Sequence, residues 1–249
     1  FNRQSDGQFA KTFDDTLRDI AIFNNDIFSV KTDSGAKIIL FDELSNYITD
    51  SSKRDAFCRA LINPLVNFSF EGIFEQKFDF FATIFEYLIK DYNKDGGGKY
   101  AEYYTPHAVA KIMAAILVDK PVKNVTAYDP AAGTGSLLMN LAHAIGEDRV
   151  TLYSQDVSQK SSGMLRLNLI LNNLVASIHN VIEGNTLVSP YHKDGNTLKT
   201  FDFIVSNPPY GERGAMARED PDEFYKEKRA YAYFMRRGLD LLIPGGIGV

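Results

Sequence analysis

Residues 125–146 read VTAYDPAAGTGSLLMNLAHAIG, which joins a strand pattern, a glycine-rich turn and a helix pattern. VTAYDP (125–130) predicts a strand, and SLLMNLAHAIG (136–146) predicts a helix. Gly133 and Gly135 lack a Cβ, so the turn between them lets a ligand approach the backbone closely. A strand, a glycine turn and a helix in this order are typical of the nucleotide-binding edge of an α/β sheet.

Strand and helix patterns alternate on both sides of this segment. TPHAVAKIMAAILV (105–118) predicts a helix, with Thr105 as its N-cap and Pro106 at its first helical position. The remaining predicted strands cover 150–156, 177–184 and 201–209, and the remaining predicted helices cover 158–173 and 231–242, the last stopped by Pro244 and Gly245. This alternation predicts βαβ units and a parallel sheet, the organisation of an α/β fold.

The N-terminal part has a helical pattern instead. FAKTFDDTLRDIAIF (9–23) places Phe9, Phe13, Leu17 and Ile20 on one apolar stripe. Further helices are predicted over 41–49, over 53–62 with Pro64 as the stop, and over 78–92 before three glycines at 96–98. We therefore predict a helical domain over 1–95 and an α/β domain over 96–249. The chain ends in GGIGV, inside the next predicted strand, so we expect the sheet to be truncated and the C-terminal part of the domain to be missing.

Composition and charge limit the classes of function. The chain is 45% hydrophobic and 24% charged and holds 18 Phe and 13 Tyr, which excludes a disordered protein. The sequence contains no run of about eighteen apolar residues, so it predicts no membrane span. The single cysteine, Cys58, and four scattered histidines argue against disulfides and metal sites and favour the cytoplasm.

The charge is unevenly distributed. Residues 1–98 carry 11 basic and 16 acidic side chains, whereas residues 99–249 carry 16 of each. The overall field therefore does not attract phosphates, and binding to nucleic acid would need a local groove or a partner. Residues 211–229 hold five basic and six acidic side chains, which predicts a solvated loop or a mobile lid.

The glycine turn favours a ligand without a pyrophosphate. A dinucleotide fingerprint would require a third glycine where Leu138 stands, and no Gly-Lys-Ser/Thr sequence for a triphosphate is present. Asp156 ends the second predicted strand, 21 residues after Gly135, where a carboxylate can accept both ribose hydroxyls of an adenosine.

NPPY (207–210) follows the apolar strand residues FIVS, which places it at the carboxyl edge of the sheet. Two prolines make a stiff loop that lacks two N–H donors. The oxygen of Asn207 and the carbonyl of Pro208 can hold the two hydrogens of a planar amine, while Tyr210 stacks on its ring. Such contacts strengthen as the amine attacks and its lone pair returns to nitrogen, so they stabilise mainly the transition state.

The order EYYTP (102–106), DPAAGTGS (129–136), a strand-end acid, EGNTL (183–187) and NPPY resembles the adenine-specific DNA methyltransferases. FEYLIKDYN (85–93), followed by GGGKYAEYYTPHAVAKIMAAIL (96–117), is similar to the modification subunit of type I restriction-modification systems. The resemblance implies a Rossmann-like methyltransferase domain, S-adenosylmethionine as cofactor, and methylation at N6 of an adenine flipped out of double-stranded DNA. It implies a specificity subunit and a restriction subunit as partners.

The resemblance also implies the site residues. The catalytic residues would be Asn207, Pro208, Pro209 and Tyr210. The residues in contact with the cofactor would be Glu102, Tyr103, Tyr104, Thr105, Pro106, His107, Asp129, Ala132, Gly133, Thr134, Gly135, Ser136, Asp156, Asn185 and Thr186.

Several alternatives remain. A single-chain restriction-modification enzyme would have the same catalytic domain. A protein glutamine N5-methyltransferase would also bind a planar amine, although EYYTP ahead of the glycine turn argues against it. A nucleotide-dependent dehydrogenase lacks its third glycine, and a non-catalytic assembly subunit would not need Asn207, Pro208 and Tyr210. Methylation of cytosine C5 needs a cysteine nucleophile, and Cys58 lies in the N-terminal helices.

Overall fold

The computed structural model describes residues 7–25, 29–32, 37–39, 43–69, 84, 87, 105–209 and 230–249. Its contacts divide the chain into two compact units. Phe1–Ser29 and Lys37–Gln76 form the first unit, and Val30–Ala36 and Lys77–Val249 form the second. The domain boundary predicted at residues 95–96 lies outside the described residues.

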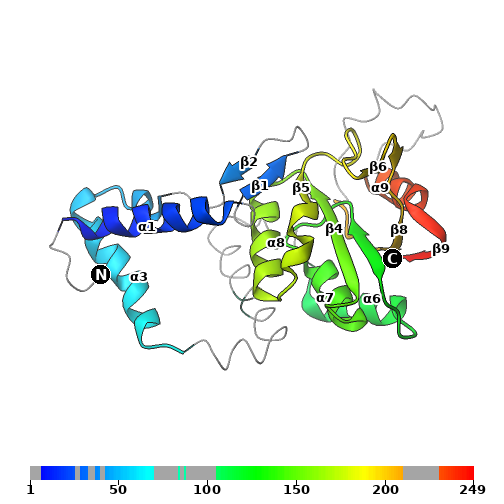
Figure 1. The fold of residues 1–249 in the computed structure, drawn as a ribbon, viewed down its shortest axis with the longest axis horizontal. Coiled ribbons are helices and arrows are strands. Elements are labelled where there is room, and N and C mark those ends of the chain that lie inside the picture. The colour runs from blue at the N-terminus through cyan, green and yellow to red at the C-terminus, as the bar shows by residue number, and fades with distance from the viewer. Residues whose placement is uncertain are drawn as a thin grey trace. The chain divides into compact units, whose positions relative to one another are not determined.

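Among the described residues of the first unit, the helices α1 (Phe9–Phe23) and α3 (Arg54–Val66) pack on each other (Figure 1). In the sequence, the helices are separated by the short strand β2 (Lys37–Ile39) and the 3₁₀ turns Leu44–Tyr47 and Ser51–Lys53. Phe9, Phe13 and Cys58 form the buried core, and Leu17 packs against it. The predicted helix 9–23 is confirmed, but Ile20 is 42% exposed and lies outside this core.

The sequence was less informative over the rest of this region. Of the predicted helix over 41–49 the structure describes residues 43–49, which form only the 3₁₀ turn Leu44–Tyr47. The strands β1 (Ser29–Thr32) and β2 were not expected. Pro64 does not stop α3, because it lies in the last turn, where only one backbone bond to Ala60 is lost. Of the predicted helix 78–92 the structure describes Ile84 and Tyr87, both helical, and the three glycines lie outside the described residues.

The second unit is built on a parallel sheet, as predicted. Its strands stand in the order β1-β5-β4-β3-β8-β9, and every neighbouring pair is parallel. The central strands are β3 (Val125–Asp129), β4 (Val150–Asp156), β5 (Val181–Glu183), β8 (Phe201–Ile204) and β9 (Leu242–Gly248). Strand β4, which follows β3 in the sequence, pairs with one edge of β3. Strand β8, which comes later, pairs with the other edge of β3. Open α/β sheets commonly bind their ligands at such a change of direction, which here lies at the carboxyl ends of β3 and β8.

The helices whose full bounds the structure describes beside the sheet are α6 (His107–Leu117), α7 (Ser136–Ile145), α8 (Gln159–Leu171) and α9 (Ala230–Asp240). Helix α7 packs on β3, β4 and α6, and α8 packs on β4 and β5 (Figure 1). In the part of the chain that the structure describes, no helix combines the length and the apolar character needed to cross a membrane.

Three expectations for this unit are wrong in detail. The first half of the predicted strand 177–184 is a 3₁₀ helix (Val175–Asn180), in which the Asn180 amide donates to the Leu152 carbonyl. Strand β8 ends at Ile204, before the prolines. Pro244 and Gly245 lie inside β9 instead of stopping α9, because β9 pairs with β8 through a register shift that accommodates them.

A hairpin between β6 (Lys193–Asp194) and β7 (Thr197–Leu198) was also not predicted. The Gly195–Asn196 turn that joins its strands was the available sequence signal, and Gly195 has a φ of +63°.

Candidate functional site

The glycine turn between β3 and α7 requires glycine for two separate reasons at position 135. Gly133 and Gly135 have φ angles of 53° and 85°, in the left-handed region that favours glycine. A Cβ on Gly135 would lie 2.1 Å from Cδ1 of Leu165 in α8. Glycine at position 135 therefore allows α8 to pack closely against the turn, whose residues 132–135 are buried.

Asp156, at the end of β4, is brought to this turn. One carboxylate oxygen accepts the Gly133 N–H at 2.8 Å, and the other accepts the Ser158 N–H at 2.8 Å. Burial raises the pKa of Asp156, while these two hydrogen bonds lower it. Because each carboxylate oxygen can accept two hydrogen bonds, Asp156 keeps one acceptor position on each oxygen for a ligand.

Asp129, the last residue of β3, is 1% exposed. One of its oxygens accepts the Ala131 N–H at 2.9 Å. Burial raises the pKa of Asp129 to about 7, and the neighbouring Asp156 carboxylate adds to this increase, whereas the Ala131 hydrogen bond opposes it. The site therefore contains a carboxyl group that changes its protonation near neutral pH.

Two motifs that lie far apart in the sequence meet beside Asp129. The side-chain nitrogen of Asn207 donates to the hydroxyl of Thr105 at 3.1 Å. The prediction that Thr105 caps α6 is wrong, because Pro106 occupies the N-cap position and the helix begins at His107. The hydroxyl of Thr105 is therefore used in the contact with Asn207.

Both side chains line one small cavity. Its walls also include Asp129, Ala131, Ala132, Thr134, Ser136 and Leu137. The cavity measures about 10 Å³, roughly the space for one water molecule. Pro208 and Pro209 follow Asn207 directly in the loop after β8 and are half-buried.

Two buried asparagines that were not predicted as site residues contact the backbone of the glycine turn and the first residue of α7. The amide of Asn140 in α7 donates to the Ser136 carbonyl at 2.8 Å and lies 3.3 Å from Nδ1 of His107. The amide of Asn168 in α8 contacts the Thr134 carbonyl at 3.4 Å. Both asparagines are buried, and an asparagine within an otherwise apolar helical run was the signal that could have revealed them.

The predicted residues Asn185 and Thr186 follow β5. The hydroxyl of Thr186 donates to the Pro130 carbonyl at 2.6 Å, so this buried side chain joins the loops after β5 and β3. Asn185 is exposed, and its side-chain oxygen accepts the N–H groups of Leu187 at 3.0 Å and Val188 at 3.4 Å. Its amide nitrogen remains as the group available to a ligand.

Part of the predicted site cannot be placed in this structure. Glu102, Tyr103, Tyr104, Tyr210 and the charged segment 211–229 lie outside the described residues. The described residues contain no group of three or more side chains arranged to hold a metal ion.

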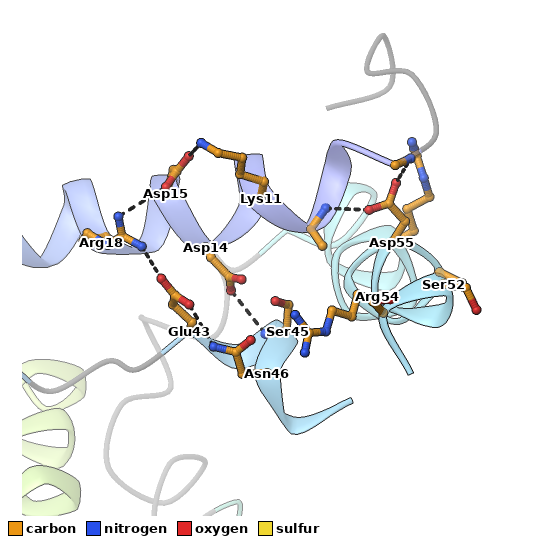
Figure 2. A pocket seen from close by; sticks show the side chains of 15 residues that line it. Lys11, Asp14, Asp15, Arg18, Glu43, Ser45, Asn46, Ser52, Arg54 and Asp55 are labelled. Carbon is orange, nitrogen blue, oxygen red and sulfur yellow. Dashed lines mark hydrogen bonds and ion pairs between the residues drawn. The ribbon is translucent and has the colours of Figure 1, made fainter. Parts of the chain in front are cut away.

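A larger pocket of about 800 Å³ lies in the first unit (Figure 2). Its carboxylates already serve local structure. Asp55 accepts hydrogen bonds from backbone N–H groups at the beginning of α1, and the buried Asp14 accepts the Ser45 N–H at 3.2 Å. Arg18 pairs with Glu43. These charges stabilise the unit, and the sequence assigns none of them to a reaction.

Comparisons with known proteins agree with the arrangement of the second unit. The family model for N-6 DNA methylases matches residues 76–246. The MpnII methylase subunit of a type I restriction enzyme from Mycoplasma pneumoniae is 26% identical over 159 residues, or 61% of this chain and 29% of its own length. The corresponding MjaIX subunit from Methanocaldococcus jannaschii is 26% identical over 157 residues, or 61% of this chain and 26% of its own length. The chain thus matches less than a third of the length of each of these relatives.

Solved structures share the fold. The methyltransferase subunit of a type I restriction-modification system from Streptococcus thermophilus has a TM-score of 0.66 at 22% identity, covering 85% of this chain and 46% of that one. A class I S-adenosylmethionine-dependent methyltransferase, described as putative, from Listeria monocytogenes has a TM-score of 0.54 at 18% identity, covering 97% of this chain and 71% of that one. The second unit therefore has the Rossmann-like fold of these methyltransferases, and since the family model covers well over half of its residues, the chain belongs to the N-6 DNA methylase family.

Proposed function

We propose that this chain is the catalytic part of a DNA methyltransferase that transfers the methyl group of S-adenosylmethionine to N6 of an adenine flipped out of double-stranded DNA. The observation that carries this proposal is the contact between Asn207 and Thr105 beside Asp129 and the glycine turn. This contact supports the proposal because the residue proposed to accept from a planar amine lies beside the turn proposed to bind a nucleoside.

The residues present fit the cofactor. Asp156 retains an acceptor position on each oxygen, which suits the two hydroxyls of a ribose. The glycine turn would hold the rest of the nucleoside without requiring a pyrophosphate. When bound, the cofactor supplies a methyl group that is already activated by its positive sulfur.

The protein's own residues would act on the adenine. Asn207 and the Pro208 carbonyl accept the two N–H groups of the amine, and the stiff Pro208–Pro209 segment keeps these acceptors in place. Because the lone pair of the amine returns to nitrogen during attack, both hydrogen bonds are stronger in the transition state than before it. Flipping the base costs a few kcal/mol, which stacking on Tyr210 would partly offset.

The cavity at Asn207 is much smaller than a nucleoside, at about 10 Å³. The proposal therefore requires the loops around it to separate when cofactor and base enter.

We further propose that the whole protein is the modification subunit of a type I restriction-modification system, which works in the cytoplasm with a specificity subunit and a restriction subunit. The names of both curated relatives support this assignment. A single-chain restriction-modification enzyme with the same catalytic domain is the alternative, and copurification of a separate specificity subunit distinguishes the two.

The test uses the full-length protein with its partners and radiolabelled S-adenosylmethionine. Asn207→Ala is expected to lower methyl transfer to adenine in DNA by about 100-fold or more, because one acceptor of the transition state is lost. The variant should keep much of its affinity for the cofactor in calorimetry. Asn196→Ala, in the exposed turn between β6 and β7, is the matched control. Unchanged turnover of Asn207→Ala, or transfer to a protein glutamine instead of DNA, would refute the proposal.

A further inference from the structure

Asn207 is connected by a side-chain hydrogen bond to Thr105, in the segment before α6. Its amide nitrogen donates to the hydroxyl of Thr105 at 3.1 Å, across 102 positions of sequence. Thr105 is buried, and both residues line the same cavity. The amide oxygen of Asn207 takes part in no hydrogen bond with any residue that the structure describes.

An asparagine amide can turn over and exchange its oxygen with its nitrogen. If the amide of Asn207 turned over, its NH₂ group would meet the hydrogens of a target amine and repel them. The group that accepts a hydrogen bond from the amide nitrogen of Asn207 therefore fixes the orientation of the amide. This orientation decides whether Asn207 can accept a hydrogen bond from the target amine.

The hydroxyl of Thr105 suits this task because it can accept from Asn207 while donating its own hydrogen elsewhere. None of the described residues receives that hydrogen, and Asp129 is among the residues that line the same cavity. When the hydroxyl donates to an acceptor in the cavity, its oxygen can only accept from Asn207, which keeps the amide in the orientation that faces a target amine.

We propose that Thr105 is a positioning residue, whose hydroxyl holds the amide of Asn207 with its oxygen directed toward the amine of the target base. This inference rests on the proposed function, and it adds a role for Thr105 besides contact with the cofactor. The hydroxyl acts through Asn207, so its contribution should disappear when Asn207 is absent.

The experiment compares Thr105→Val, which keeps the shape but removes the hydroxyl, with Thr105→Ser, which keeps the hydroxyl, in the full-length protein and its complex. Thr105→Val should lower the turnover on DNA about tenfold to hundredfold, because a buried amide hydrogen bond is lost and the amide can turn over. The dissociation constant of S-adenosylmethionine, measured by calorimetry, should change by less than about threefold. Thr105→Ser should recover most of the lost turnover.

Two further measurements separate the possible explanations. In an Asn207→Ala background, Thr105→Val should have no additional effect on turnover, and a chemical-unfolding cycle of the same variants should show coupling between the two residues. Thr126→Val is the matched control, since its hydroxyl contacts Asp202 at the opposite end of β3 and its loss should leave turnover unchanged.

Equal losses in Thr105→Val and Thr105→Ser, additive losses with Asn207→Ala, or a loss confined to cofactor affinity would overturn the positioning role. Failure of the proposed function looks different. In that case the unmodified protein transfers no methyl group to DNA, or Asn207→Ala transfers it normally. The unfolding cycle still reports whether the hydrogen bond between Thr105 and Asn207 exists.

Discussion

Asp129 combines deep burial with a position in the cavity wall beside Thr105 and Asn207. Its pKa is about 7 in the folded chain, against an ordinary value of 3.8. The folded state therefore binds the proton of Asp129 more tightly than the unfolded state does. The stabilisation that results is complete below pH 3.8 and is lost as the pH rises through about 7.

This pH dependence gives a prediction for Asp129→Asn, because the asparagine side chain has nearly the same shape as aspartate but does not titrate. The free energy of unfolding of the wild type, minus that of the variant, should fall by roughly 1 kcal/mol per pH unit between about pH 5 and pH 7. Chemical denaturation at several pH values measures this difference, and Asp119→Asn, at an exposed position, is the control. A difference that is constant with pH would show that Asp129 is already ionised over this range.

At the scale of elements, the glycine turn joins α7 to α8 by close packing. Gly135 begins α7 with a φ of 85°, and a Cβ there would overlap Cδ1 of Leu165. Backbone conformation and packing thus both exclude a side chain at this position.

Gly135→Ala should destabilise the full-length protein by about 3 kcal/mol, from left-handed strain and overpacking together. Gly195→Ala separates the two causes, because Gly195 also has a positive φ but nothing lies within 4 Å of the position that a Cβ would take there. This control should cost only about 1 kcal/mol. The double variant Gly135→Ala/Leu165→Ala should be less destabilised than the sum of its single variants, as measured by urea denaturation. Strictly additive losses would rule out the overlap with Leu165.

At the scale of the whole molecule, charge limits how this chain can bind DNA. The chain has a net charge of −5, and residues 99–249 have equal numbers of basic and acidic side chains. We therefore expect the 249-residue chain to bind duplex DNA weakly and without sequence preference, with a dissociation constant of about 1 µM or weaker at physiological salt. Fluorescence anisotropy with unrelated duplexes tests this expectation. Tight binding to one sequence by this chain alone would contradict it.

Local patterns were sufficient for the order β3, α7, β4 and α8 in the second unit, but not for β1 or the β6–β7 hairpin. The strand before the glycine turn, the helix after it and the alternation that follows depend on residue periodicity, which acts over a few neighbours. The same patterns gave wrong predictions where contacts with a distant segment of the chain decide the local conformation. Pro244 and Gly245 read as a helix stop, yet they lie in β9 because β8 offers it a pairing edge.

The sequence by itself therefore determined the parallel α/β fold, the glycine turn and the motifs that carry the resemblance. Only the tertiary structure decided that Thr105 faces Asn207 instead of capping α6, that Asp156 holds the Gly133 N–H, and that Asn140 and Asn168 support the turn. These contacts join residues from separate elements, and they form only when the sheet brings the carboxyl ends of its strands together.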